Sequence, residues 1–241
     1  MKISDFKALS FDCYGTLIDW ESGIISAFTP WLVKSRLKLD PVELLCSFAK
    51  HEAWIEENRP WLLYPDILAR TFQNIAIEYG VHATDHDARK FANSVPSWPA
   101  FADSNEALVR LQRHFKLVIL SNVDRKSFIG SSKRLGVTFE LVLTAQDIGS
   151  YKPSLWNFER LLGEVQHLGI TRDQLLHVAQ SLFHDHQPAK TLGLSTVWIN
   201  RRQGKDGWGA TPPCDLEIMP DWEFSTLGAL ADEVERESGL Q

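Results

Sequence analysis

Five short runs of mostly apolar residues, separated by helical patterns, constrain the fold of this chain more than any other feature. The runs cover residues 7–11, 116–120, 141–144, 175–179 and 196–200 and read KALSF, KLVIL, LVLT, LLHVA and TVWIN. Strands that are apolar on both faces are typical of a parallel sheet covered by helices on both sides. The sequence therefore predicts an α/β fold whose core is a doubly wound, Rossmann-like parallel sheet.

Residues 20–95 interrupt this alternation, because only helical patterns occur there. Helices are predicted at residues 41–58, 65–79 and 85–93. Asp40 and Pro41 suit the cap and the first position of the first of these helices. Since the block lies between the first strand and the others, we predict an inserted all-helical cap domain at 20–95. The remaining residues, 1–19 and 96–241, then form the Rossmann-like core.

The charge and the cysteines limit the classes of partner. A formal net charge of −6 argues against nucleic acid or an anionic membrane as the main partner, because both attract basic surfaces. Cys13, Cys46 and Cys214 are an odd number without CxxC spacing, which argues against a disulfide framework or a zinc site. No apolar stretch has the pattern of a signal peptide or the length of a membrane span, so we expect a cytoplasmic protein.

Polar residues follow several of the predicted strands, at the edge where a doubly wound sheet binds its ligands. The candidate catalytic residues are Asp12, Thr16, Ser121, Lys152 and Asp185, with Asn122 beside them. Together they offer a nucleophile, a cation, a second carboxylate and small hydrogen-bond donors. This set suits covalent catalysis, in which one carboxylate attacks, the cation orients it, and the second acid activates water for release. Each residue alone is commonly a cap, turn or loop residue, so the prediction depends on their order and spacing.

Four motifs in this order resemble those of the haloacid dehalogenase superfamily, and the resemblance covers almost the whole chain. The motifs read DCYGTL at 12–17, LSN at 120–122, YKP at 151–153 and VAQSLFHD at 178–185. The helical block between the first two motifs corresponds to the cap domain of that superfamily. The resemblance implies a hydrolase with Asp12 as its nucleophile.

Two departures from the phosphatases of this superfamily concern the metal. Those enzymes have an aspartate two residues after the nucleophile and a magnesium-binding aspartate at the start of the fourth motif. This chain has Tyr14 and Gln180 at these positions. A hard divalent cation prefers carboxylate oxygens, so the resemblance implies no metal, no cofactor and no phosphoryl transfer.

With Tyr14 two residues after the nucleophile and no metal ligands, the chain resembles the L-2-haloacid dehalogenase branch. The branch implies hydrolysis of a small 2-substituted carboxylic acid through an ester on Asp12, with halide as the leaving group. By resemblance, Thr16, Ser121 and Lys152 hold the Asp12 carboxylate, and Asp185 activates the hydrolytic water. The implied substrate-binding residues are Tyr14, Trp20, Asn122, Phe183, Arg59 and Ser181. Relatives are often dimers, so the resemblance also implies a homodimer.

The cap helix leaves the identity of the leaving group open. Residues 43–58 contain no arginine to receive a halide. Arg59 is the nearest cation that could replace it, and the alternative interpretation of Arg59 is an exposed surface residue. Glu52, Glu56 and Glu57 would instead suit an amine, as in the hydrolytic ring opening of L-azetidine-2-carboxylate. The other interpretation of these glutamates, for at least two of them, is a solvated helix face. A third hypothesis is a non-catalytic binding relative, which the joint presence of Asp12, Lys152 and Asp185 disfavours.

Overall fold

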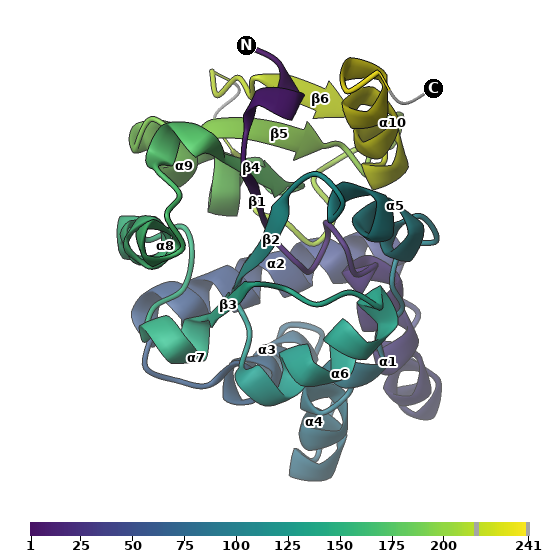
Figure 1. Cartoon of the computed structure of the whole chain (residues 1–241). Coiled ribbons are helices and arrows are strands. Elements are labelled where there is room, and N and C mark those ends of the chain that lie inside the picture. Colours follow the sequence, from purple (N-terminus) through teal and green to yellow (C-terminus); the bar gives the residue numbers. More distant parts are fainter. Residues whose placement is uncertain (215–216, 240–241) are drawn as a thin grey trace.

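Six parallel strands form one sheet in the order β3-β2-β1-β4-β5-β6 in a computed structural model, which describes residues 1–214 and 217–239 (Figure 1). The strands are β1 (Ala8–Phe11), β2 (Lys116–Ser121), β3 (Leu141–Thr144), β4 (Leu175–Ala179), β5 (Ser195–Ile199) and β6 (Trp222–Phe224). The predicted doubly wound α/β fold is confirmed. The order of the strands reverses between β1 and β4, which is where such a sheet binds its ligands.

The first five strands lie within one residue of the predicted runs, whereas β6 was not predicted. Strands β1 and β4 are buried at every position, which explains why they read as continuous apolar runs. Strand β6 has only three residues and an exposed glutamate, Glu223, at its centre. A strand this short at the edge of the sheet produces no recognisable pattern.

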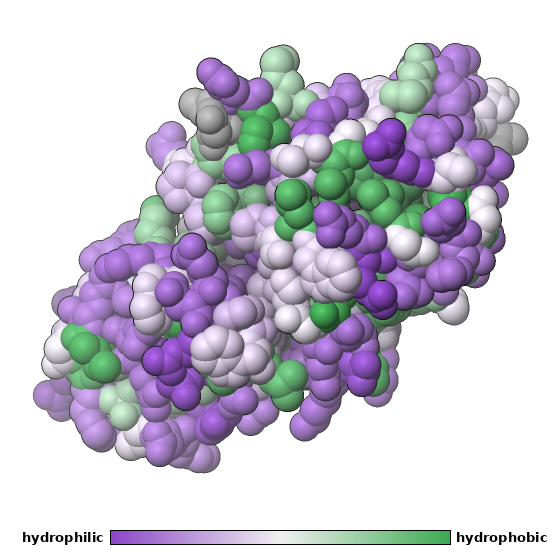
Figure 2. Space-filling model, turned by 90° about the vertical axis from the view of Figure 1, so that its left-hand side faces the viewer, coloured by the Kyte–Doolittle hydropathy of each residue, from purple (hydrophilic) through white to green (hydrophobic). Residues whose placement is uncertain are grey.

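The core helices flank the sheet. They are α5 (Ser104–Leu111), α6 (Arg125–Leu135), α7 (Ala145–Ile148), α8 (Leu155–His167), α9 (Gln187–Thr191) and α10 (Leu227–Glu237). Between them and the strands, buried aliphatic and aromatic side chains form the core. Figure 2 shows a face that is mostly hydrophilic, with hydrophobic residues gathered on its upper right part and single ones elsewhere.

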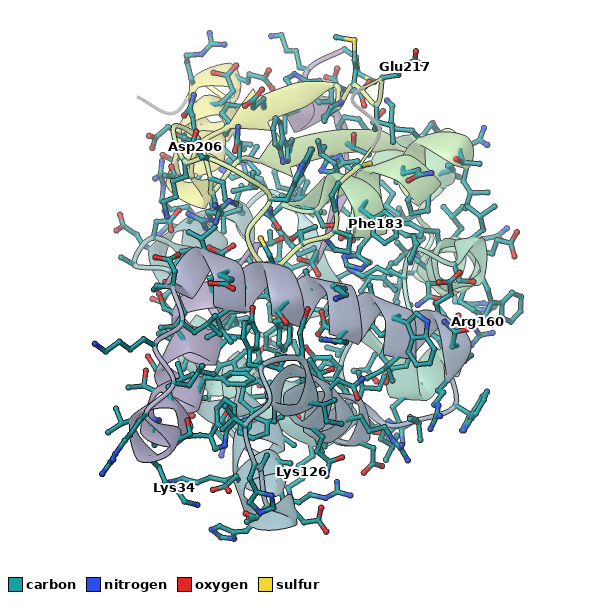
Figure 3. All side chains as sticks on the ribbon, turned by 180° about the vertical axis from the view of Figure 1, so that it is seen from behind. Lys34, Lys126, Arg160, Phe183, Asp206 and Glu217 are labelled. Carbon is teal, nitrogen blue, oxygen red and sulfur yellow. The ribbon has the colours of Figure 1, made fainter. Side chains whose placement is uncertain are left out.

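The all-helical insert after β1 is also confirmed. It contains α1 (Trp20–Ser35), α2 (Pro41–Asn58), α3 (Tyr64–Glu78) and α4 (Asp85–Ala92). The rings of Phe28, Phe72 and Phe91 form its aromatic centre, with the Phe28 centroid 4.8 Å from Phe72 and 4.4 Å from Phe91. In the view from behind, α2 crosses the molecule between the core and the rest of the cap (Figure 3). Across the described residues, no helix has the length and apolarity needed to cross a membrane.

Candidate active site

The carboxyl ends of β1 and β4 bring Asp12 and Asp185 to either side of the Lys152 ammonium. Lys152 Nζ lies 2.9 Å from Asp12 Oδ1 and 2.6 Å from Asp185 Oδ1, and it donates a third hydrogen bond to the Leu120 carbonyl at 3.1 Å. All three side chains are buried. This group of two carboxylates and one ammonium, which we call the buried trio, has a net charge of −1 when all three groups are ionised.

The three charges shift one another's pKa. Burial raises the pKa of the Asp12 carboxyl above its ordinary value and Asp185 adds to the rise, although Lys152 and Thr16 oppose it. Asp185 is also desolvated, but the Lys152 ammonium and a histidine hold its pKa well below the usual range. Burial disfavours the ammonium, yet the two carboxylates raise the pKa of Lys152 above its ordinary value. Asp12 is therefore the more basic carboxylate, as a nucleophile should be.

The loop after β1 fixes the second oxygen of Asp12. Thr16 Oγ1 donates to Asp12 Oδ2 at 2.7 Å and accepts from the backbone N–H of Gln180 at 2.9 Å. Gly15 has a φ of 95°, and a Cβ atom there would lie 3.0 Å from the indole nitrogen of Trp20, so this turn requires glycine. Both oxygens of the Asp12 carboxylate are thus held, and its orientation is set by the core.

Asp185 is held at one oxygen only. His177 Nε2 lies 3.0 Å from Asp185 Oδ1, and His177 Nδ1 lies 2.9 Å from Ser10 Oγ. Asp185 Oδ2 is buried and has no hydrogen-bond partner among the described residues. One carboxylate oxygen is consequently fixed by Lys152 and His177, while the other is free to accept a hydrogen bond in the pocket.

His177 and Ser10 were not predicted as site residues, because both lie inside runs that read as apolar strands. The signal that could have identified them is their pairing, since Ser10 and His177 are opposite each other in the parallel register of β1 and β4. A histidine inside a fully buried strand needs a polar partner, and the neighbouring strand supplies it.

A small pocket of about 30 Å³ lies over the buried trio. It is lined by Asp12, Tyr14, Trp20, Glu52, Glu56, Tyr64, Ser121, Asn122, Lys152, Gln180, Ser181, His184, Asp185 and Thr211. The structure thus brings most of the predicted site residues together, and Thr16 lies behind Asp12. No role was predicted from the sequence for Tyr64 or Thr211.

Three of the predicted residues have different surroundings from those expected. The Ser121 hydroxyl makes no hydrogen bond to Asp12 or to any other group in the described part of the chain, although it faces the pocket. Arg59 is half-buried after the end of α2 and does not line the pocket. Phe183 lies on the core side of α2 and lines a neighbouring groove rather than the pocket (Figure 3).

Two glutamates of α2 form the roof of the pocket, so a solvated helix face is the wrong interpretation for them. Glu52 and Glu56 are only 3% and 5% exposed, whereas Glu57 is exposed. Tyr64 donates to Glu52 Oε1 at 2.6 Å. Asn122 Nδ2 donates to Glu56 Oε2 at 3.1 Å and to the Lys152 carbonyl at 3.0 Å, so it joins the cap to the core.

Burial makes both roof glutamates weak acids. It raises the pKa of Glu52 to about 8, and it raises the pKa of Glu56 well above its usual value, to which the charge of Glu52 contributes. Glu52 therefore carries a proton at neutral pH, and burial favours the protonated form of Glu56 as well. The roof is then uncharged, and it presents hydroxyl donors to the pocket instead of negative charges.

Replacing Glu52 by glutamine should flatten the dependence of stability on pH. The folded chain keeps the Glu52 proton up to about pH 8, while the unfolded chain releases it near the ordinary pKa of 4.5. Protonated Glu52 contributes its full share to the free energy of unfolding below pH 4.5. This share falls by about 1.4 kcal/mol per pH unit as the pH rises from there toward the pKa of the folded state. Urea unfolding of both proteins across this range measures the effect. Parallel curves for the wild type and Glu52→Gln would show that Glu52 is ionised when folded.

Comparison with known proteins gives a family and a fold. A family model for "Haloacid dehalogenase-like hydrolase" matches residues 65–199, more than half of the chain, and no curated protein matches. The L-2-haloacid dehalogenase RSc1362 is 20% identical, with a TM-score of 0.78 over 96% of this chain and 99% of that chain. The L-2-haloacid dehalogenase from Xanthobacter autotrophicus with chloropropionic acid covalently bound is 19% identical, with a TM-score of 0.75 over 95% and 98%.

A magnesium-bound structure is equally similar. The HAD-hydrolase YfnB from Bacillus subtilis bound to magnesium is 18% identical, with a TM-score of 0.76 over 95% of this chain and 99% of that chain. At these identities the likeness of all three structures to this chain shows the fold alone.

Magnesium does not fit the side chains of the pocket. Both Asp12 oxygens accept hydrogen bonds from Lys152 and Thr16, and the ammonium already lies between the two carboxylates. The Tyr14 hydroxyl is bonded to a serine of α6, and Gln180 offers a neutral amide. Magnesium requires near-octahedral oxygen ligands with carboxylates among them. Within residues 1–214 and 217–239, no three His, Cys, Asp or Glu side chains are grouped to hold a metal ion.

Proposed function

Because the chain belongs to the haloacid dehalogenase-like hydrolase family, we propose that it hydrolyses a 2-substituted carboxylic acid through an ester on Asp12. One observation carries the proposal: the Asp12 carboxylate is fixed at both oxygens in a buried pocket, with Tyr14 and Gln180 at the positions of the phosphatase acids. A carboxylate oriented by an ammonium is arranged for attack at carbon. Phosphoryl transfer would need charge neutralisation that this donor set does not provide.

In the first step, an Asp12 oxygen attacks C2 of the substrate. The bond from C2 to the leaving group breaks, its electron pair goes with the leaving group, and an ester forms with inversion at C2. Ser121 supports this step, because its buried hydroxyl lines the pocket without a partner in the described structure and is free to bind the substrate carboxylate. The third N–H of Lys152 is already bonded to the Leu120 carbonyl, so the ammonium stays with the two aspartates.

In the second step, water attacks the carboxyl carbon of Asp12. Asp185 Oδ2 orients this water and accepts its proton as the attack proceeds, while Lys152 and His177 hold the other oxygen. The bond between the Asp12 carbonyl carbon and the substrate oxygen then breaks, and the departing oxygen takes the proton from Asp185. This regenerates the Asp12 carboxylate and releases a 2-hydroxy acid whose hydroxyl oxygen came from Asp12.

A single turnover in heavy-oxygen water tests the proposal. With enzyme in excess over (S)-2-chloropropionate, and with EDTA present, the first product should contain no label, because its new oxygen comes from Asp12. Label should then accumulate in the Asp12 peptide, which mass spectrometry detects. A labelled first product would mean direct attack by water, and loss of activity in EDTA that magnesium restores would contradict the metal-free reaction.

Halide is the first candidate for the leaving group. Among the described residues, no arginine lines the pocket, but Trp20 lines it and offers an indole N–H. The protonated roof of Glu52 and Glu56 adds neutral donors without repelling an anion. A halide leaving into this pocket would therefore be received by N–H and O–H groups, which lower the cost of a desolvated anion.

A ring amine is the second candidate, and the buried roof is the observation that favours it. A strained imino acid such as L-azetidine-2-carboxylate needs a proton on its departing nitrogen. Burial favours the protonated form of Glu56, which lies over the same pocket as Asp12. As Asp12 attacks C2 and the C2–N bond breaks, the nitrogen keeps the electron pair and takes the Glu56 proton, which leaves a neutral amine beside an ionised glutamate.

Trp20→Phe and Glu56→Gln distinguish the two leaving groups. If halide leaves, Trp20→Phe should reduce turnover of (S)-2-chloropropionate by about 100-fold, as loss of one donor to a developing anion does, and Glu56→Gln should be mild. If an amine leaves, Glu56→Gln should remove ring opening of L-azetidine-2-carboxylate and Trp20→Phe should be mild. Steady-state rates of the wild type and of both variants, measured with each substrate, distinguish the two cases. Equal effects of the two changes on one substrate would exclude both assignments.

A further inference from the structure

A groove of about 1010 Å³ lies beside the pocket, between α2 and two loops of the core. We call it the α2 groove; its walls are α2, residues 150–154, and residues 207–213. In the view from behind, the chain after β5 descends toward α2, with Phe183 on the core side (Figure 3). The groove is far larger than the pocket of about 30 Å³ over the buried trio. It has the size that sites for small organic ligands usually have.

The α2 groove adjoins the pocket over the buried trio. Glu56, Lys152, His184 and Thr211 line both the groove and the pocket, so the two cavities are separated only by these side chains. His184 is buried at this boundary, and burial lowers its pKa to about 4, so it is uncharged at neutral pH. The boundary therefore has no cation other than Lys152, which is fully bonded to protein groups.

The walls of the groove are mainly apolar. They include Ala49, Ala53, Trp54, Phe183, Trp208 and Pro213. Trp54 is 52% exposed, so part of its indole ring is available to a ligand in the groove. The charged side chains at the groove are Lys50, Glu56 and Glu57 on α2 and Lys152 on the core side. Lys50 is already paired with Glu78 at 2.8 Å, and Lys152 with the two aspartates. Such a surface favours an uncharged hydrocarbon or aromatic group.

We propose that the α2 groove binds an apolar chain or ring carried on C2 of the substrate. The inference rests on the proposed function for the position of C2, and it identifies the substrates as 2-substituted acids with medium-length alkyl or aryl groups. A two- or three-carbon acid would fill the pocket and leave the groove to water. A longer substituent passes the boundary at Glu56 and His184 and lies along α2 between Trp54 and Trp208.

Unreactive carboxylic acids test the groove without any need for turnover. Calorimetric titration with propionate, hexanoate and octanoate should show affinity that rises about fourfold for each added methylene, as burial of hydrocarbon predicts. Octanoate should also quench or shift the tryptophan fluorescence of the protein, because Trp54 and Trp208 line the groove. Propionate should leave that fluorescence unchanged.

Ala53→Trp would fill the groove from α2, where Ala53 is half-buried. It should weaken octanoate binding by about tenfold or more and leave propionate binding unchanged. Val42→Trp is the matched control, because Val42 is exposed on the same helix and does not line the groove. It should change neither affinity.

Two results would overturn the inference. Equal binding of propionate and octanoate by the wild-type protein would mean that the groove holds no part of the ligand. Equal weakening of both acids by Ala53→Trp would mean that the groove is only an entrance. Failure of the proposed chemistry is recognised separately, because it removes turnover of the halo acid and leaves the chain-length dependence of binding intact.

Discussion

Asp12→Asn should reduce turnover by about 10⁴-fold or more, since an amide oxygen cannot form the ester that the reaction requires. The same change should leave the free energy of unfolding equal to the wild-type value or higher. Lys152 would then face one carboxylate instead of two, and the net charge of the buried trio would change from −1 to zero. Turnover assays and urea unfolding on one preparation measure both effects.

Asp124→Asn is the matched control for this prediction. Asp124 is also a buried aspartate, but it caps α6 by accepting from the backbone N–H of Ser127 at 3.1 Å, and asparagine caps helices equally well. This variant should keep both turnover and stability. If Asp12→Asn destabilised the protein as much as it inactivated it, Asp12 would have to be regarded as structural.

Lys152→Met should lower the free energy of unfolding, unlike Asp12→Asn, and should also abolish turnover. It leaves Asp12 and Asp185 buried without their cation, and unpaired buried charges of this kind cost about 3–5 kcal/mol. The loss should be largest at neutral pH. It should shrink as the pH falls, because protonation of the two carboxylates removes their charge. Urea unfolding at neutral and mildly acidic pH measures this trend.

A second change separates charge from shape. Adding Asp185→Asn to Lys152→Met removes one of the two unpaired charges and should recover about half of the lost stability, with no return of activity. A double variant that is no more stable than Lys152→Met would show that the loss came from packing and not from charge.

The sequence predicted the parts of this molecule that depend on local pattern. The apolar runs predicted the five longer strands, and the order of the motifs predicted that Asp12, Lys152 and Asp185 meet at one edge of the sheet. Parallel strands place their carboxyl ends together, so topology is enough to bring such residues into one site. Strand β6 was too short to show a pattern.

What could not be predicted depends on how the cap sits on the core. Glu52 and Glu56 look like surface charges in the sequence of α2, and only the packing of that helix over the sheet buries them. Arg59 is one turn further along and lies outside the pocket. Ser121 follows β2 as expected, but its hydroxyl orientation depends on side-chain packing that no spacing rule describes.

The side chains that hold Asp12 and Asp185 come from the core and not from the cap, and this division affects how a substrate enters and leaves. In the described chain, Asp12 and Asp185 accept side-chain hydrogen bonds only from Thr16, Lys152 and His177, and all of these belong to the core. The cap contributes walls, a roof and the single Asn122–Glu56 hydrogen bond to that network. A displacement of the cap would therefore admit or release a substrate without rearranging the groups that hold the two carboxylates. The preorganisation of Asp12 and Asp185 depends on the core, and changes in the cap can alter selectivity without disturbing it.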